Sequence, residues 1–94
     1  MIKNKKEKNM VEFSYNITDP QGIHARPAGI FVKEAASFPC SITVGKDGKD
    51  VDAKRILGVM SLGVKQGEEI VVKCDGEQEA EAAEKLEAFL KENL

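Results

Sequence analysis

The spacing of apolar residues changes near residue 24, and this change limits the possible folds more than any other feature of the sequence. Residues 11–17 alternate apolar and polar side chains, which is typical of a strand with one buried face. From Ala25 to Ser37 the apolar residues recur at helical spacing instead. Pro27 is tolerated only in the first turn of a helix, where its missing N–H is not needed. The chain must therefore pass from a strand to a helix start close to His24.

The rest of the sequence continues this alternation of short strands and helices. Strands are predicted at 41–44 and 50–52, joined by a turn whose Asp-Gly pair is typical of a hairpin. A helix is predicted from Ala53 to Leu62, then a strand from Glu69 to Cys74, and a last helix after Gly76. The order βαββαβα, with its short hairpin, predicts an α+β domain with helices on one face of an antiparallel sheet.

Length and composition restrict the domain organisation and the class of function. The chain has 94 residues, enough for one domain with one small core. Residues 1–9 are polar and lysine-rich, so we expect a disordered basic extension there and an ordered domain at 10–94. A formal net charge of −2 and the absence of tryptophan argue against nucleic-acid binding. Because neither a signal peptide nor a membrane-length apolar run is present, we expect a cytoplasmic protein.

The two cysteines, Cys40 and Cys74, do not form the framework of a disulfide-rich secreted protein. One histidine and two isolated cysteines do not match a metal-ligand pattern either, so we expect no metal and no cofactor. We interpret both cysteines as small apolar side chains. Whether they approach each other does not follow from the sequence.

The stretch Gly22–Ala28 contains the only histidine of the chain and one of its two arginines. A neutral imidazole is a good nucleophile, and a helix start can stabilise a phosphoryl group attached to it. Arg26 can add charge-assisted hydrogen bonds to the phosphoryl oxygens. A hydrolase would need further partners and a pocket, and we interpret the nearby Asp19 as part of a turn. From these residues alone, a phosphoryl-accepting His24 and a His24 that only caps the helix both remain open.

Two blocks of the sequence resemble the histidine-containing phosphocarrier HPr of the bacterial phosphoenolpyruvate:sugar phosphotransferase system. Gly22-Ile23-His24-Ala25-Arg26-Pro27-Ala28 is similar to the active-site signature of that family. Ile56-Leu57-Gly58-Val59-Met60-Ser61-Leu62-Gly63 is similar to its second helix. Spacing and element order agree from about Met10 to the C-terminus. The resemblance implies an open-faced β-sandwich, in which three helices cover four antiparallel strands.

The resemblance also implies a function and a set of site residues. An HPr-like protein is a carrier rather than an enzyme: it takes a phosphoryl group from phosphorylated Enzyme I and passes it to the IIA domains of sugar permeases. His24 would be phosphorylated on Nδ1, and Arg26 would stabilise the phosphoryl group. Ala25 and Pro27 would form the supporting helix start, and Gln21 would help to anchor the loop. We expect a monomer that meets membrane permeases only at their periphery.

The resemblance places partner docking on the first two helices. The second helix has more apolar residues than one face can bury, so we expect part of them to be exposed. Gly29, a weak helix former, suggests the close approach of a neighbour. The implied docking residues are Gly29, Arg55, Ile56, Leu57 and Met60.

Arg55 occupies a position where some HPr proteins have a regulatory serine that an ATP-dependent kinase phosphorylates. Arginine cannot be phosphorylated by that kinase, and it is a poor cap at a helix start, so we expect Asp52 to cap the helix instead. Ser61 lies inside the helix and does not match the regulatory serine. Arg55 reflects either drift in a lineage without the kinase or a cation that meets an acidic partner surface. Both interpretations remain open.

Two other functions are compatible with the same fold. One is a regulatory binding module that relays no phosphoryl group, although such relatives lack the histidine. The other is an HPr-like carrier for a side branch, such as a nitrogen-related phosphorelay or a dihydroxyacetone kinase. The sequence does not separate a sugar branch from these regulatory branches.

Overall fold

The computed structural model describes residues 10–94, and within them the elements follow the predicted order βαββαβα. The expected extension at 1–9 lies outside the described residues. The strands are β1 (Val11–Asn16), β2 (Ser41–Lys46), β3 (Lys49–Asp52) and β4 (Glu69–Asp75). The helices are α2 (Ala25–Ala36), α3 (Ile56–Ser61) and α4 (Glu79–Asn93). The predicted α+β fold, with three helices and a four-stranded antiparallel sheet, is confirmed.

The sheet has the order β1-β4-β2-β3, and every neighbouring pair is antiparallel. β4 is central: it pairs with β1 from Val11↔Cys74 to Asn16↔Glu69, and with β2 on its other side. Alternate β4 residues are buried and form the floor of the core: Ile70, Val72 and Cys74. The loops that follow β1 and precede β4 therefore meet at the same end of the sheet.

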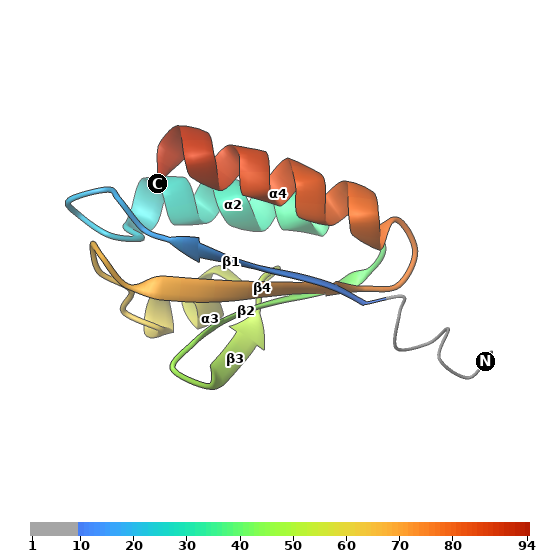
Figure 1. Ribbon diagram of the computed structural model, residues 1–94, viewed down its shortest axis with the longest axis horizontal. Coiled ribbons are helices and arrows are strands. Elements are labelled where there is room, and N and C mark those ends of the chain that lie inside the picture. Colours follow the sequence, from blue (N-terminus) through green and yellow to red (C-terminus); the bar gives the residue numbers. More distant parts are fainter. Residues whose placement is uncertain (1–9) are drawn as a thin grey trace.

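Helices α2 and α4 lie side by side over the sheet, and α3 packs against β3 and α2 (Figure 1). Phe31 on α2 and Phe89 on α4 have ring centroids 6.1 Å apart. Leu86 and Leu90 on α4 are fully buried with Phe31 in the same core. This packing sets the C-terminal end of α4 beside the first turn of α2 (Figure 1). No helix within residues 10–94 combines the length and apolar character needed to cross a bilayer.

Helix α3 begins later than the predicted second helix, because the residues before it form a turn. The Ala53 N–H still donates to the carbonyl oxygen of Ile42 on β2, at 2.9 Å. Asp52 Oδ1 accepts a hydrogen bond from the Lys54 N–H, also at 2.9 Å. Arg55 is the N-cap residue of α3, without a side-chain cap hydrogen bond. The expectation that Asp52 caps this helix is wrong, because its carboxylate is engaged in the preceding turn.

Cys40 and Cys74 are free thiols, and both are buried. Cys74 lies opposite Ile42 in the β2–β4 ladder, and Cys40 lies just before β2, so both cysteines sit at one end of the sheet. Burial raises the pKa of both thiols, and that of Cys74 reaches about 11. Both thiols are therefore protonated at neutral pH and serve as small core side chains.

Candidate functional site

The loop between β1 and α2, residues 17–24, is held at both ends by backbone hydrogen bonds to the segment before β4. The Ile17 N–H donates to the Glu68 carbonyl oxygen at 3.0 Å, and the Ile17 carbonyl oxygen accepts from the Gly67 N–H at 2.7 Å. The Ile23 N–H donates to the Val64 carbonyl oxygen at 3.1 Å. The residue before His24 is thereby attached to a segment that is distant in sequence.

The middle of this loop is fixed by the end of α4 and by a turn of its own. The N–H groups of Thr18 and Asp19 both donate to the backbone oxygen of Leu94, at 2.6 and 2.9 Å. Asp19 Oδ1 accepts from the Gln21 N–H, and the Gly22 N–H donates to the Asp19 carbonyl oxygen, both at 2.8 Å. Asp19 therefore has the turn role predicted for it. The side chain of Gln21 is exposed and makes no hydrogen bond within residues 10–94, so its contact to the loop is through its backbone.

Gly22 is the glycine at which a close approach occurs. Its φ is +68°, and a Cβ at this position would collide with the Val64 carbonyl oxygen and lie 2.8 Å from Lys65 Cα. At Gly29, by contrast, a Cβ would lie 3.6 Å from Ile56 Cδ1, which is an ordinary contact. The expectation of a close approach at Gly29 is wrong, because α3 leaves room there for a methyl group. The turn at Gly22 requires glycine for both conformation and space.

His24 is the N-cap residue of α2, with extended φ and ψ of −100° and 176° and no side-chain cap hydrogen bond. Its carbonyl oxygen accepts the Ala28 N–H at 3.0 Å, so the N–H groups of Ala25 and Arg26 have no intrahelical partner. Pro27 lies in the first turn, as predicted, and is buried. The first turn of α2 contains no acidic residue. The positive end of the helix is therefore available to an anion.

A hollow of about 180 Å³ lies at this helix start and brings together residues from the loop and two helices. It is lined by Asp19, His24, Arg26, Pro27, Ile30 and Asn93. Asp19 Oδ2 lies 3.5 Å from His24 Nε2. Asp19 and Asn93 are site residues that the sequence interpretation missed. Turn chemistry close before the only histidine could have pointed to Asp19, whereas Asn93 is distant in sequence and gives no local signal.

The residues implied for docking lie on α2, α3 and the residue before α3. Leu57 is 81% exposed, and Ile30, Ile56 and Met60 are also exposed, whereas Val59 and Leu62 are buried. The prediction that part of the apolar set is exposed is therefore confirmed. We call Ile30, Ile56, Leu57 and Met60 the α2–α3 surface. Arg55 is exposed at its edge, directly before α3.

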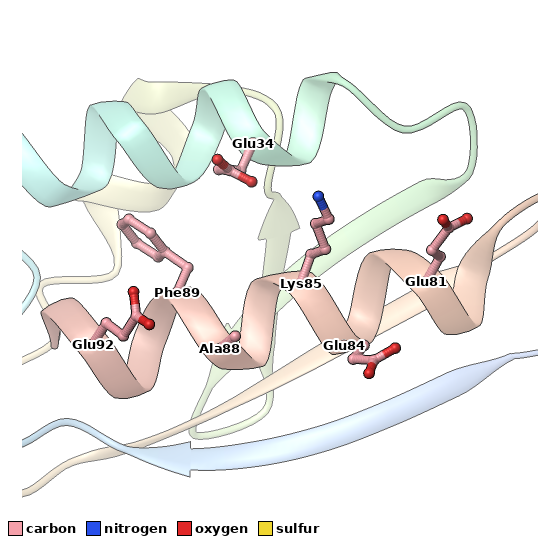
Figure 2. A pocket seen from close by; sticks show the side chains of 7 residues that line it. All are labelled: Glu34, Glu81, Glu84, Lys85, Ala88, Phe89 and Glu92. Atoms are coloured by element: carbon pink, nitrogen blue, oxygen red, sulfur yellow. The ribbon is translucent and has the colours of Figure 1, made fainter.

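A larger hollow of about 540 Å³ lies between α2 and α4, away from His24. Figure 2 shows Glu34 of α2 facing Lys85 and Phe89 of α4 across this space. Its charged lining is mostly acidic: Glu34, Glu81, Glu84 and Glu92 against Lys85. These carboxylates repel a phosphoryl group, and no histidine or cysteine lines the hollow. The smaller hollow beside His24 is the better candidate for chemistry.

Four antiparallel strands covered by three helices, with a single histidine at the open start of the first helix, define the class of small phosphocarrier proteins. The family described as "PTS HPr component phosphorylation site" matches residues 11–92, and the chain belongs to this HPr family.

Three relatives show how close the similarity is. HPr-like protein Crh of Bacillus subtilis is 44% identical over 85 residues, covering 90% of this chain and all of Crh. The crystal structure of a phosphocarrier protein HPr from Bacillus anthracis str. Ames has a TM-score of 0.81 at 41% identity, covering 86% of this chain and 96% of that one. A crystal structure of Bacillus subtilis Crh, described as an intertwined dimer with a swapping domain, has a TM-score of 0.71 at 44% identity, covering 85% and 92%.

Proposed function

We propose that this chain accepts a phosphoryl group on His24 Nδ1 from phosphorylated Enzyme I and passes it to the IIA domains of sugar permeases. One observation carries the proposal: His24 lies at an open helix start whose first turn contains no acidic residue, in the same hollow as Arg26. The chain acts as a cytoplasmic, monomeric carrier within the relay, and it meets membrane permeases only at their periphery.

The transfer uses groups that are already in position. The Nδ1 lone pair attacks phosphorus, the N–P bond forms, and the bond between phosphorus and the donor atom breaks with its electrons going to the donor. The N–H groups of Ala25 and Arg26 and the positive end of α2 stabilise the phosphoryl oxygens. The Arg26 guanidinium adds charge-assisted hydrogen bonds. Transfer to a IIA domain repeats these steps with His24 as the leaving group.

We infer that both partners dock on the α2–α3 surface. Exposed apolar residues give a partner a contact area, and one of them, Ile30, also lines the hollow that contains His24. Arg55, next to this surface, favours partners with an acidic rim. An acidic rim that meets Arg26 and Arg55 would also orient the partner's phosphoryl donor or acceptor group toward His24.

A regulatory binding module is the second candidate function, and the identity to Crh favours it. His24 and the absence of a serine at position 55 argue against it, because the regulatory form of the family uses phosphoserine. A carrier for a nitrogen-related or dihydroxyacetone kinase branch would use the same site as the sugar carrier. The identity of the acceptor domain separates these branches from the sugar branch.

Incubation with phosphoenolpyruvate and Enzyme I tests the proposal. We expect one acid-labile phosphoryl group on the chain and its onward transfer to a sugar-specific IIA domain. His24→Ala should abolish the label, and Arg26→Ala should slow transfer while the fold stays intact. Lys33→Ala, which removes an exposed cation from the last turn of the same helix, is the matched control. A label that persists in His24→Ala would refute the assignment.

A further inference from the structure

The Asp19 side chain lies beside the His24 ring as well as in the turn. Its Oδ1 accepts the Gln21 N–H, while its second oxygen, Oδ2, lies 3.5 Å from Nε2. The two side chains are partly buried, at 24% and 36% exposure, so water screens the pair less than it would a fully exposed one. The distance is long for a hydrogen bond, but such contacts often tighten only when the reacting partner is bound.

The carboxylate of Asp19 has little freedom to turn away from the ring. Its backbone N–H donates to the backbone oxygen of Leu94, and its Oδ1 accepts the Gln21 N–H. Arg26 and Asn93 complete the polar groups of the hollow, and neither is a carboxylate. Among the residues that the structure describes, Asp19 is thus the one anionic side chain that lines the hollow.

We propose that Asp19 is a positioning residue for His24: its Oδ2 accepts the Nε2 proton, so that Nδ1 keeps its lone pair and is the atom that attacks phosphorus. This proposal rests on the function proposed above and extends it to a residue outside the family-like block at 22–28. A neutral imidazole carries one proton, so a carboxylate at Nε2 leaves Nδ1 bare.

Asp19 also balances charge during the transfer. When Nδ1 bonds to phosphorus, the ring still carries its proton on Nε2 and acquires a positive charge. Asp19 stabilises this charge on the side of the ring away from the phosphoryl group. When the phosphoryl group leaves, the N–P electrons return to Nδ1 and the ring is neutral again, with its proton still on Nε2. No proton has to enter or leave the site.

Two substitutions separate this role from the turn role. In Asp19→Asn, the side-chain oxygen can still accept the Gln21 N–H, but the amide NH₂ then faces Nε2 and favours a proton on Nδ1. In Asp19→Ser, the hydroxyl can keep the turn and leaves Nε2 without a partner. Asp75→Asn is the matched control: it removes one exposed carboxylate at the opposite end of β4, where Asp75 pairs with Ser41.

The test uses the full chain with ¹⁵N-labelled histidine, at a pH at which the ring is neutral. We expect the share of the bare-Nδ1 tautomer to fall in the order wild type, Asp19→Ser, Asp19→Asn, and the rate of transfer from phosphorylated Enzyme I to fall about tenfold in Asp19→Asn. Asp75→Asn should match wild type in both. Unchanged tautomers in both Asp19 variants, or an unchanged rate, would overturn the proposal. A wild-type chain that accepts no phosphoryl group would refute the proposed function, whereas the tautomer measurement reads Asp19 alone.

Discussion

Gly22 combines a left-handed backbone conformation with a contact that leaves no room for a side chain. Its φ of +68° costs a non-glycine residue about 1–2 kcal/mol. A Cβ would also push against the Val64 carbonyl oxygen, which accepts the Ile23 N–H. Both the backbone conformation and the lack of space therefore require glycine at position 22, in the loop that positions His24.

Gly22→Ala should lower the free energy of unfolding by about 3 kcal/mol, since the left-handed conformation and a lost backbone hydrogen bond both contribute. Gly63→Ala is the matched control, because Gly63 has a φ of +59° but nothing within 4 Å of its Cβ position. We expect a loss of only about 1–2 kcal/mol there. Urea denaturation of the two variants measures both values, and equal losses would show that the contact with Val64 is unimportant.

Cys74 makes the stability of the core depend on pH in the alkaline range. Burial raises its pKa from 9.0 to about 11 in the folded state, so the unfolded chain releases this proton first as the pH rises. Stability from the protonated thiol is complete below pH 9.0 and is lost as the pH rises to about 11.

Between these pH values the wild type should lose about 2–3 kcal/mol more stability than Cys74→Ala. The alanine variant forms a cavity, but its cost is the same at every pH, so the difference in slope isolates the thiol. Cys40 titrates in both proteins, so the difference in slope contains the Cys74 thiol and its repulsion from Cys40. Denaturation curves recorded across this range give the slopes, and parallel slopes would contradict the prediction.

At the scale of single residues, the sequence singles out candidate site residues more readily than it predicts their contacts. His24 and Arg26 stand out because their residue types are scarce and they precede a helical pattern. The proximity of Asp19 to the ring depends on the angle of the turn between them, which no spacing rule gives. The bonds from Thr18 and Asp19 to Leu94 depend on the packing of α4, which only the folded chain determines.

At the scale of elements, α3 differs most from its sequence pattern. The apolar spacing extends back to Ala53, but Asp52 closes a turn on Lys54 and Ala53 stays bonded to β2. The helix therefore starts after Arg55, with no side-chain cap and a cation at its N-terminus. Local hydrogen bonding of an aspartate prevailed over the helical pattern.

Arg55→Ser should stabilise the protein by about 1 kcal/mol, because serine caps a helix and removes a cation from its positive end. The same variant should become a substrate of the ATP-dependent HPr kinase, whereas the wild type should give no phosphoserine. Ser61, whose hydroxyl donates to the Gly58 carbonyl oxygen at 2.6 Å, is the internal control and should stay unlabelled. Thermal denaturation and mass spectrometry read the two effects, and wild-type phosphorylation at Ser61 would contradict our interpretation of Arg55.

At the scale of the whole molecule, the periodicity of apolar residues predicted the order of the elements but not which strands are neighbours in the sheet. Each strand and helix has its own local pattern, which is why βαββαβα and the antiparallel sheet were predictable. The order β1-β4-β2-β3 joins the first strand to the last one, and that pairing follows from the packing of α2 and α4 over one sheet face. The geometry of the candidate site also depends on this packing, because the loop before His24 is hydrogen-bonded to the ends of elements that are distant in sequence.

The position of β1 at a sheet edge raises the question of exchange between two copies, as described for Crh. Exchange of β1 would require the loop at 17–24 to open into an extended hinge. Opening breaks the turn at Asp19. It also strains the hydrogen bonds from Thr18 to Leu94 and from Ile23 to Val64. Each such bond contributes about 0.5–1.5 kcal/mol, so the closed loop favours the monomer.

Light scattering across a wide dilution series should therefore give the mass of one chain at every concentration. Gly22→Ala weakens the same closed loop, and strained or loosened hinges promote exchange, so this variant should form more dimer than the wild type. Gly63→Ala, which lies outside the hinge, should remain monomeric. A wild-type dimer that persists on dilution would contradict the prediction. If that dimer formed by exchange of β1, two chains would share the hydrogen bonds that position His24, and the proposed phosphoryl-accepting site would belong to a pair of molecules.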